Sequence, residues 1–143
     1  MLSIDTNILL YAQNADCSEY ARASGFLTEW TGRSDVVLCE LVLVELYILL
    51  RNPAVVARPL GAKAAAVVCQ AYRKHPRWRL VENAPVMAQV WKLAAGESFA
   101  RRRIIDVRLA RTLQHHGVTT LATVNARDFA GLGFARVWNP LAD

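Results

Sequence analysis

The sequence has little that would carry a chain into or across a membrane. Its most apolar stretch, from Val36 to Leu50, is shorter than the ~20 residues of a bilayer span and contains Glu40 and Glu45. The amino terminus has no basic segment, and Asp5 interrupts its first apolar run, so we expect no signal peptide. The 3 cysteines have no CxxC spacing and match reduced thiols. We therefore expect a cytoplasmic protein that is not associated with a membrane.

Several common binding motifs are also missing. The chain has neither a G-x-G-x-x-G nor a G-x-x-x-x-G-K motif, which disfavours a nucleotide-binding domain. Its cysteines and histidines lack the spacing of a zinc site, and we interpret His75, His115 and His116 as helix-end or surface residues. A phosphatase of the aspartyl-phosphate type would need an aspartate two residues after Asp5, where this chain has Asn7.

Internal repeats, low-complexity tracts and Gly/Ser linkers are absent as well. The 143 residues are 54% hydrophobic and 20% charged, a composition typical of a globular chain that can bury a core. We therefore expect one domain that spans residues 1–143.

The charge that is present is mostly basic. The chain has 17 Lys and Arg residues against 12 Asp and Glu residues, which gives a formal net charge of +5. Most of the basic residues are arginines, whose planar guanidinium group suits phosphate oxygens. Nucleic acid is therefore one possible partner, although many basic proteins bind none.

Hydrophobic patterning predicts strands that alternate with helices. Expected strands are 1–5, 36–39, 78–81 and 118–123, with a last short one at 136–138. Expected helices are 6–11, 16–30, 40–51 and 62–74, one that starts at Pro85, and a long one that ends at 115–117. This alternation indicates an α/β fold in which helices cover both faces of a mostly parallel sheet. In such sheets, functional groups gather beyond the carboxyl ends of the strands.

Two acidic residues follow expected strands. Asp5 ends the first strand, where a ligand would be met, although an aspartate there could equally be the N-cap of the next helix. Asp128 follows the strand that ends at Thr123, and its alternative interpretation is a turn or capping residue.

Three further acids lie on predicted helices, and two of them, Glu45 and Asp106, adjoin apolar residues. The neighbours of Glu45 are almost all apolar, so the helix has no evident solvent face, and the carboxylate needs a cation, a hydrogen bond or a buried arginine partner. Glu40 is in the first turn, about 140° away around the helix, and is interpreted as a helix-start residue. Asp106 flanks a predicted core stripe that includes Ile105, and could instead pair with Arg102 one turn earlier.

Four blocks of the sequence, taken together, resemble a known family. They are Ile4-Asp5-Thr6-Asn7, Leu43-Val44-Glu45-Leu46-Tyr47 with Leu50-Arg51-Asn52-Pro53, Ile104-Ile105-Asp106-Val107-Arg108-Leu109-Ala110 with His116-Gly117-Val118, and Thr123-Val124-Asn125-Ala126-Arg127-Asp128-Phe129. In this order they resemble the motifs of PIN domains, and in particular of VapC-type toxins of type II toxin–antitoxin systems. Val124 departs mildly from the pattern, because relatives often have a polar or basic residue there.

The resemblance implies a three-layer α/β/α sandwich and a ribonuclease that depends on Mg²⁺ or Mn²⁺. The catalytic, metal-binding acids that it implies are Asp5, Glu45, Asp106 and Asp128. The supporting polar residues that it implies are Thr6, Asn7, Thr123 and Asn125. Hard divalent cations prefer such oxygen ligands.

Partners follow from the same resemblance. It implies an RNA substrate, a cognate antitoxin protein and a homodimer. The arginines that adjoin Asp106 are candidates for RNA contacts or, with equal weight, for a solvated charged face; they are Arg101, Arg102, Arg103 and Arg108. The alternative function is a catalytically inactive PIN-like module that binds RNA or protein.

Overall fold

The computed structural model describes residues 1–142, which form a five-stranded parallel sheet with helices on both faces. The strands are β1 (Leu2–Ile4), β2 (Val36–Cys39), β3 (Arg79–Val81), β4 (Thr120–Ala122) and β5 (Arg136–Trp138). Their order across the sheet is β3-β2-β1-β4-β5, and every neighbouring pair is parallel. All five predicted strands are present, which confirms the mostly parallel α/β fold.

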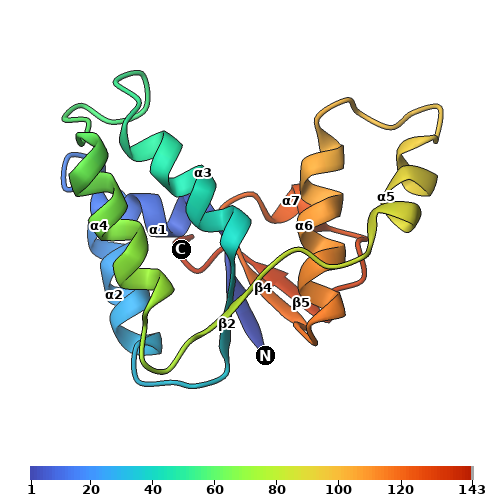
Figure 1. The fold of residues 1–143 in the computed structure, drawn as a ribbon, viewed down its shortest axis with the longest axis horizontal. Helices are drawn as coiled ribbons and strands as arrows, with labels where there is room; N and C mark the ends of the chain where they lie inside the picture. Colours follow the sequence, from blue (N-terminus) through green and yellow to red (C-terminus); the bar gives the residue numbers. More distant parts are fainter. Residues whose placement is uncertain (143) are drawn as a thin grey trace.

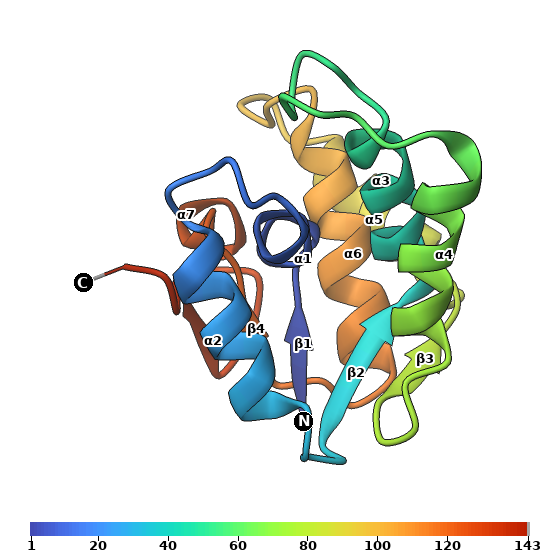
Figure 2. The same ribbon diagram turned by 90° about the vertical axis from the view of Figure 1, so that its left-hand side faces the viewer.

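Seven helices form the two outer layers of the described part of the chain. They are α1 (Thr6–Gln13), α2 (Tyr20–Trp30), α3 (Glu40–Leu50), α4 (Ala62–Arg73), α5 (Met87–Ala94), α6 (Arg103–His115) and α7 (Ala126–Phe129). Helices α1 to α4 cover one face of the sheet and α5 to α7 cover the other (Figures 1 and 2). The predicted three-layer sandwich is therefore confirmed. Right-handed crossovers explain the division, because the chain moves across the sheet in opposite directions before and after β3.

The central strands consist of apolar residues because both of their faces are covered. Every residue of β1 and β2 is buried, including Ser3, whose hydroxyl donates a hydrogen bond to the carbonyl oxygen of Val37 at 2.6 Å. Edge strand β5, in contrast, has an exposed arginine and two partly buried residues. The near-continuous apolar pattern of the centre is the one expected for parallel strands packed on two sides.

Some helix boundaries differ from the prediction. Helix α2 begins at Tyr20, not at residue 16, because Asn14 forms a turn there: its side chain accepts a hydrogen bond from the amide of Asp16, and its carbonyl accepts one from Cys17. Helix α5 begins at Met87 and not at Pro85, and the short helix α7 was not predicted. None of the helices in the described residues combines the length and apolar character needed to cross a bilayer.

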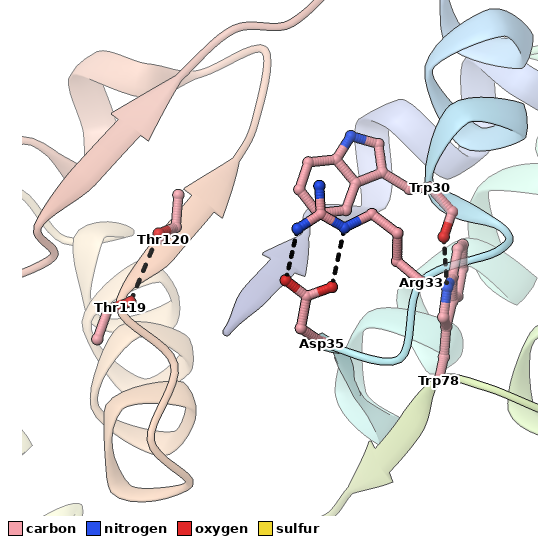
Figure 3. Close-up of polar contacts among 6 residues, drawn as sticks. All are labelled: Trp30, Arg33, Asp35, Trp78, Thr119 and Thr120. Carbon is pink, nitrogen blue, oxygen red and sulfur yellow. Dashed lines mark hydrogen bonds and ion pairs between the residues drawn. The ribbon is translucent and has the colours of Figure 1, made fainter.

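The amino end of the sheet is closed by a tethered turn between α2 and β2 (Figure 3). The Trp78 indole donates to the carbonyl oxygen of Trp30 at 3.2 Å, and the guanidinium of Arg33 lies 4.0 Å from the centre of the Trp30 ring. Arg33 also forms a two-point ion pair with Asp35, whose carbonyl oxygen accepts a hydrogen bond from Leu2. These contacts connect α2, β1, β2 and β3 at the end of the sheet opposite to Asp5.

Helix α3 has a solvent face, which corrects the prediction that it lacks one. Leu46 is fully buried, whereas Val44 and Ile48 have 49% and 58% of their surface exposed. Hydrophobic composition alone did not reveal this face, because apolar residues occupy both sides of the helix.

The two faces of α3 should respond differently to truncation. We expect Leu46→Ala to lower the free energy of unfolding by about 3 kcal/mol, because it leaves a cavity in the core. Ile48→Ala, the matched control on the exposed face, should change it by less than about 0.5 kcal/mol. Urea unfolding followed by circular dichroism measures both values, and equal losses would contradict the assigned faces.

Candidate active site

The candidate site lies where the strand order reverses. The chain runs from β1 outward to β2 and β3, and then returns to place β4 on the other side of β1. The carboxyl ends of β1 and β4 are therefore the switch point at which ligands bind in open α/β sheets. Asp5 directly follows β1, and Thr123 directly follows β4.

Asp5 is held rigidly at this point. It is buried, with 8% of its surface exposed, and its Oδ1 accepts a hydrogen bond from the amide of Thr6 at 2.8 Å. Its Oδ2 accepts a hydrogen bond from the Thr123 hydroxyl at 2.7 Å. Asp5 is thus the N-cap of α1 and a member of the site at once. Burial raises its pKa, hydrogen bonds from Thr123 and Thr6 oppose the rise, and the charge of Asp128 adds to it.

Thr123 and Asn7 orient the loop after β4 as well as Asp5. The Thr123 hydroxyl accepts a hydrogen bond from the amide of Asn125 at 3.0 Å, and the Asn7 side-chain oxygen accepts one from the amide of Val124 at 3.3 Å. The Asn7 side-chain nitrogen also lies 3.5 Å from Asp5 Oδ2. Three of the four predicted supporting residues, Thr6, Asn7 and Thr123, therefore contact Asp5.

Glu45 is connected to the site by the hydroxyl of Thr6. The Thr6 hydroxyl donates to Glu45 Oε2 at 3.2 Å and lies 3.3 Å from the carbonyl oxygen of Val42. Glu45 is half-buried, because α3 has a solvent face, and it has the hydrogen-bond partner that the sequence predicted as one of its alternatives. Desolvation nevertheless raises its pKa, with the Thr6 hydrogen bond opposing and the charge of Asp5 adding to the rise.

The charges of the other three acids all raise the pKa of Asp106. Partial burial, followed by the charges of Asp128 and Asp5, raises its pKa to about 6; Arg103 opposes the rise, and Glu45 adds to it. Asp106, Glu45, Asp128 and Asn125 also line one pocket of about 570 Å³ between α3, α6 and the loop after β4. The structure thus brings the four predicted acids together.

Glu40 is separate from this cluster. It begins α3, as predicted, and its carboxylate forms an ion pair with Arg73 of α4 at 2.9 Å. Its side chain borders two other surface depressions. Among residues 1–142, in contrast, the ion pairs involve none of the four clustered acids.

The predicted arginine candidates occupy different positions. Arg102 lines the acidic pocket, and Arg101 is exposed beside it in the sequence. Arg103 donates a hydrogen bond to the carbonyl oxygen of Asp128 at 3.1 Å. Burial raises the pKa of Cys39, at the end of β2, and the nearby charge of Arg108 opposes this rise.

The sequence analysis did not identify three apolar residues that line the pocket. Ile48, Leu49 and Ile105 line it together with the acids. Ile105 is 45% exposed, so its assignment to the core stripe of α6 is wrong; the buried residues there include Val107, Leu109 and Leu113. Helical spacing could have indicated that Ile48 adjoins the acids, because it lies three residues after Glu45 and therefore on the same side of the helix.

Comparison with known proteins agrees with this architecture. The family model of the PIN domain matches residues 2–135, so the chain belongs to the PIN-domain family. Proteins named Ribonuclease VapC24, from Mycobacterium tuberculosis strains CDC 1551 / Oshkosh and ATCC 25618 / H37Rv, are 62% identical to it over 141 residues. The alignments cover 99% of this chain and 97% of each relative, and place the chain among the VapC-type members of the family.

Solved structures share the fold at lower identity. Mycobacterium tuberculosis VapC20, described as a toxin that cleaves the sarcin-ricin loop, matches with a TM-score of 0.70 and 19% identity over 94% of this chain and 97% of its own. FitAcB from Neisseria gonorrhoeae matches with a TM-score of 0.65 and 24% identity over 98% of both chains.

The crowded carboxylates should cost stability in the absence of a cation. Because the pKa of Asp106 is about 6 in the folded protein and 3.8 ordinarily, protonation stabilises the fold below pH 3.8, and this stabilisation is lost as the pH rises through 6. At pH 7.5 we expect Asp106→Asn to raise the melting temperature by roughly 3 °C, or about 1 kcal/mol, since solvent screens much of the repulsion.

Thermal melts in EDTA at pH 7.5 and pH 4 measure this effect, which should shrink at the lower pH. Glu29→Gln, which removes an exposed carboxylate of α2, is the matched control and should shift the melting temperature by less than about 1 °C. A destabilised Asp106→Asn variant at pH 7.5 would contradict the inferred repulsion.

Proposed function

We propose that the chain is a divalent-metal-dependent ribonuclease that hydrolyses RNA phosphodiester bonds. The observation that carries the proposal is the convergence of Glu45, Asp106 and Asp128 on one pocket, with Asp5 close enough for its charge to raise the pKa of Glu45 and Asp106. Among the described residues, none of these four carboxylates forms an ion pair. The names of the 62% identical relatives, Ribonuclease VapC24, support the same reaction.

The donor set fits Mg²⁺ or Mn²⁺. All of the candidate ligands are carboxylate oxygens, and their mutual repulsion is relieved when a cation binds. Within residues 1–142, no three Asp, Glu, His or Cys side chains are already arranged to bind one ion directly. Because Mg²⁺ keeps several waters and uses few direct carboxylate ligands, some contacts between these acids and the ion would run through water.

The residues of the chain have distinct roles in this proposal. When bound, a divalent cation supplies a water of lowered pKa and positive charge against the phosphate. Asp5, Glu45 and Asp106 would be the principal ligands, and Asp128 would bind a second ion or hold a water. Thr123 and Thr6 would fix the Asp5 and Glu45 carboxylates by the hydrogen bonds described above.

A catalytically inactive PIN-like module that binds RNA or protein is the alternative function. The grouping of all four acids, three of them in one pocket and Asp5 close enough to act on Asp106 by its charge, favours the nuclease, because a binding module has no use for crowded, unpaired carboxylates that destabilise it. Metal-dependent cleavage separates the two functions.

We expect purified protein to cleave RNA in Mg²⁺ or Mn²⁺ and not in EDTA. Asp5→Asn and Asp106→Asn should each lower the cleavage rate by roughly 100- to 1,000-fold, equivalent to about 3–4 kcal/mol of transition-state stabilisation. Gel analysis of total RNA and tRNA measures the effect. Glu29→Gln, on the distant surface of α2, should cleave at the parent rate.

Cation binding has a readout that does not depend on cleavage. Millimolar Mg²⁺ should raise the melting temperature of the parent and leave that of the Asp5→Asn/Asp106→Asn double variant unchanged. Cleavage that survives in both single variants would indicate a contaminating nuclease, and an unchanged parent melting curve would count against a metal site.

We also infer that the chain is the toxin of a toxin–antitoxin pair, controlled by a protein encoded beside it, and that it forms a homodimer. Its VapC-type membership supports both inferences. A basic or bulky antitoxin side chain in the acidic pocket would inhibit it, so Asp128→Asn should weaken the complex by roughly tenfold, with Glu29→Gln as control. Titration calorimetry measures this affinity.

The homodimer has a separate test. Light scattering that gives only a monomer mass would exclude it.

A further inference from the structure

His75 lies in the turn that connects α4 to β3, at the amino end of the sheet. Its Nδ1 atom accepts hydrogen bonds from the amides of Arg77 at 3.1 Å and Trp78 at 3.2 Å. Because a backbone amide can only donate, Nδ1 carries no proton, and the proton of the neutral ring is on Nε2. The Nε2 atom lies 3.1 Å from the hydroxyl oxygen of Thr31 and therefore donates to it.

The same ring packs against Trp78. The two rings are nearly parallel, at 13°, with their centroids 4.2 Å apart. Tyr72 of α4, which is uncharged because burial raises its pKa, lies parallel to Trp78 with ring centroids 6.4 Å apart. The Trp78 indole donates the hydrogen bond to Trp30 at the end of α2 (Figure 3). Residues 75–78, which we refer to as the His75 turn, thus connect α2, α4 and β3.

A proton on Nδ1 is incompatible with the closed His75 turn. A protonated imidazole donates from both nitrogens and accepts at neither. The amides of Arg77 and Trp78 would then lose their acceptor and meet an N–H group in its place. His75 is partly exposed, so solvent can supply the proton.

The charges around the ring also favour its neutral form. Burial lowers the pKa of His75 below its ordinary value of 6.5, and the charge of Arg77 lowers it further. Lys74, the preceding residue, is a second cation in this segment. On the α2 side, Arg33 and Asp35 are paired with each other. Within the part of the chain that the structure describes, no carboxylate forms an ion pair with the ring.

We propose that the His75 turn is a proton-sensitive closure, which is closed while the imidazole is neutral and opens when Nδ1 takes up a proton. Because the pKa of the folded group is lowered, the closed turn contributes stability above pH 6.5 that is lost as the pH falls through the folded pKa. Opening releases the contacts that join α2 to the start of β3. The inference is independent of the proposed ribonuclease function, since the acidic pocket lies at the other end of the sheet.

Amide hydrogen exchange followed by NMR at pH 7.5 and pH 5 tests this closure. After correction for the intrinsic effect of pH on exchange, we expect the amides of Arg77 and Trp78 to lose protection roughly tenfold at pH 5, the effect of about one lost hydrogen bond. Amides of the buried strand β1 should keep their protection. Nitrogen chemical shifts of the His75 ring should show the proton on Nε2 at pH 7.5.

Two variants remove the titrating group. His75→Asn supplies a side-chain oxygen that can accept a hydrogen bond from the amide two residues later and does not titrate, whereas His75→Ala supplies no acceptor. In both variants, the protection of the Arg77 and Trp78 amides should be the same at the two pH values. His115→Asn, which changes an exposed histidine of α6, is the matched control and should lose protection in acid as the parent does. Thermal melts at pH 7.5 show that the variants fold.

Three results would overturn the inference. They are equal protection of the two amides in the parent at both pH values, a loss of protection in His75→Asn as large as that of the parent, and a proton on Nδ1 at pH 7.5. A parent protein that cleaves no RNA would count against the proposed ribonuclease alone, so the two failures are distinguishable.

Discussion

The hydrogen bond between the Thr123 hydroxyl and the Asp5 carboxylate is the contact on which the site depends. It measures 2.7 Å and joins the carboxyl ends of β1 and β4, residues 118 positions apart in the chain. Asp5 is also the N-cap of α1, so the same side chain fixes the start of that helix and, through Thr123, the start of the loop whose Asn125 and Asp128 line the pocket. Because Thr6 of the same turn reaches Glu45 on α3, three elements are positioned around one buried carboxylate.

This arrangement brings like charges together against their mutual repulsion. Desolvation is the largest cause of the raised pKa of Asp5, Glu45 and Asp106, and neighbouring carboxylates add to it in each case. The sheet behind them supplies the compensating stability through strands that are buried on both faces. Binding of the proposed cation would remove a repulsion that folding has already imposed on these carboxylates.

Sequence patterning predicted the layers and the acids better than the surfaces. The boundaries of β2 follow from a short, partly β-branched run after turn residues, and Asp5 and Asp128 follow from their places after strands. The exposed positions of Ile48 and Ile105 could not be predicted in this way, because an apolar residue on a functional surface looks like a core residue. The start of α2 depends on the side chain of Asn14, a local competition that helical periodicity does not detect.

The neighbouring arginines at the start of α6 make different contacts in the folded chain. Arg102 faces the pocket, whereas Arg103 donates its hydrogen bond to the backbone carbonyl of Asp128. An ion pair with the Asp128 carboxylate would have neutralised a candidate ligand. By bonding the carbonyl instead, Arg103 anchors α7 to α6 and holds Asp128 near Asp106, while the carboxylate has no ion-pair partner within residues 1–142. The same interaction therefore helps to assemble the acidic pocket and leaves the Asp128 carboxylate free of an ion pair, as the proposed cation site requires.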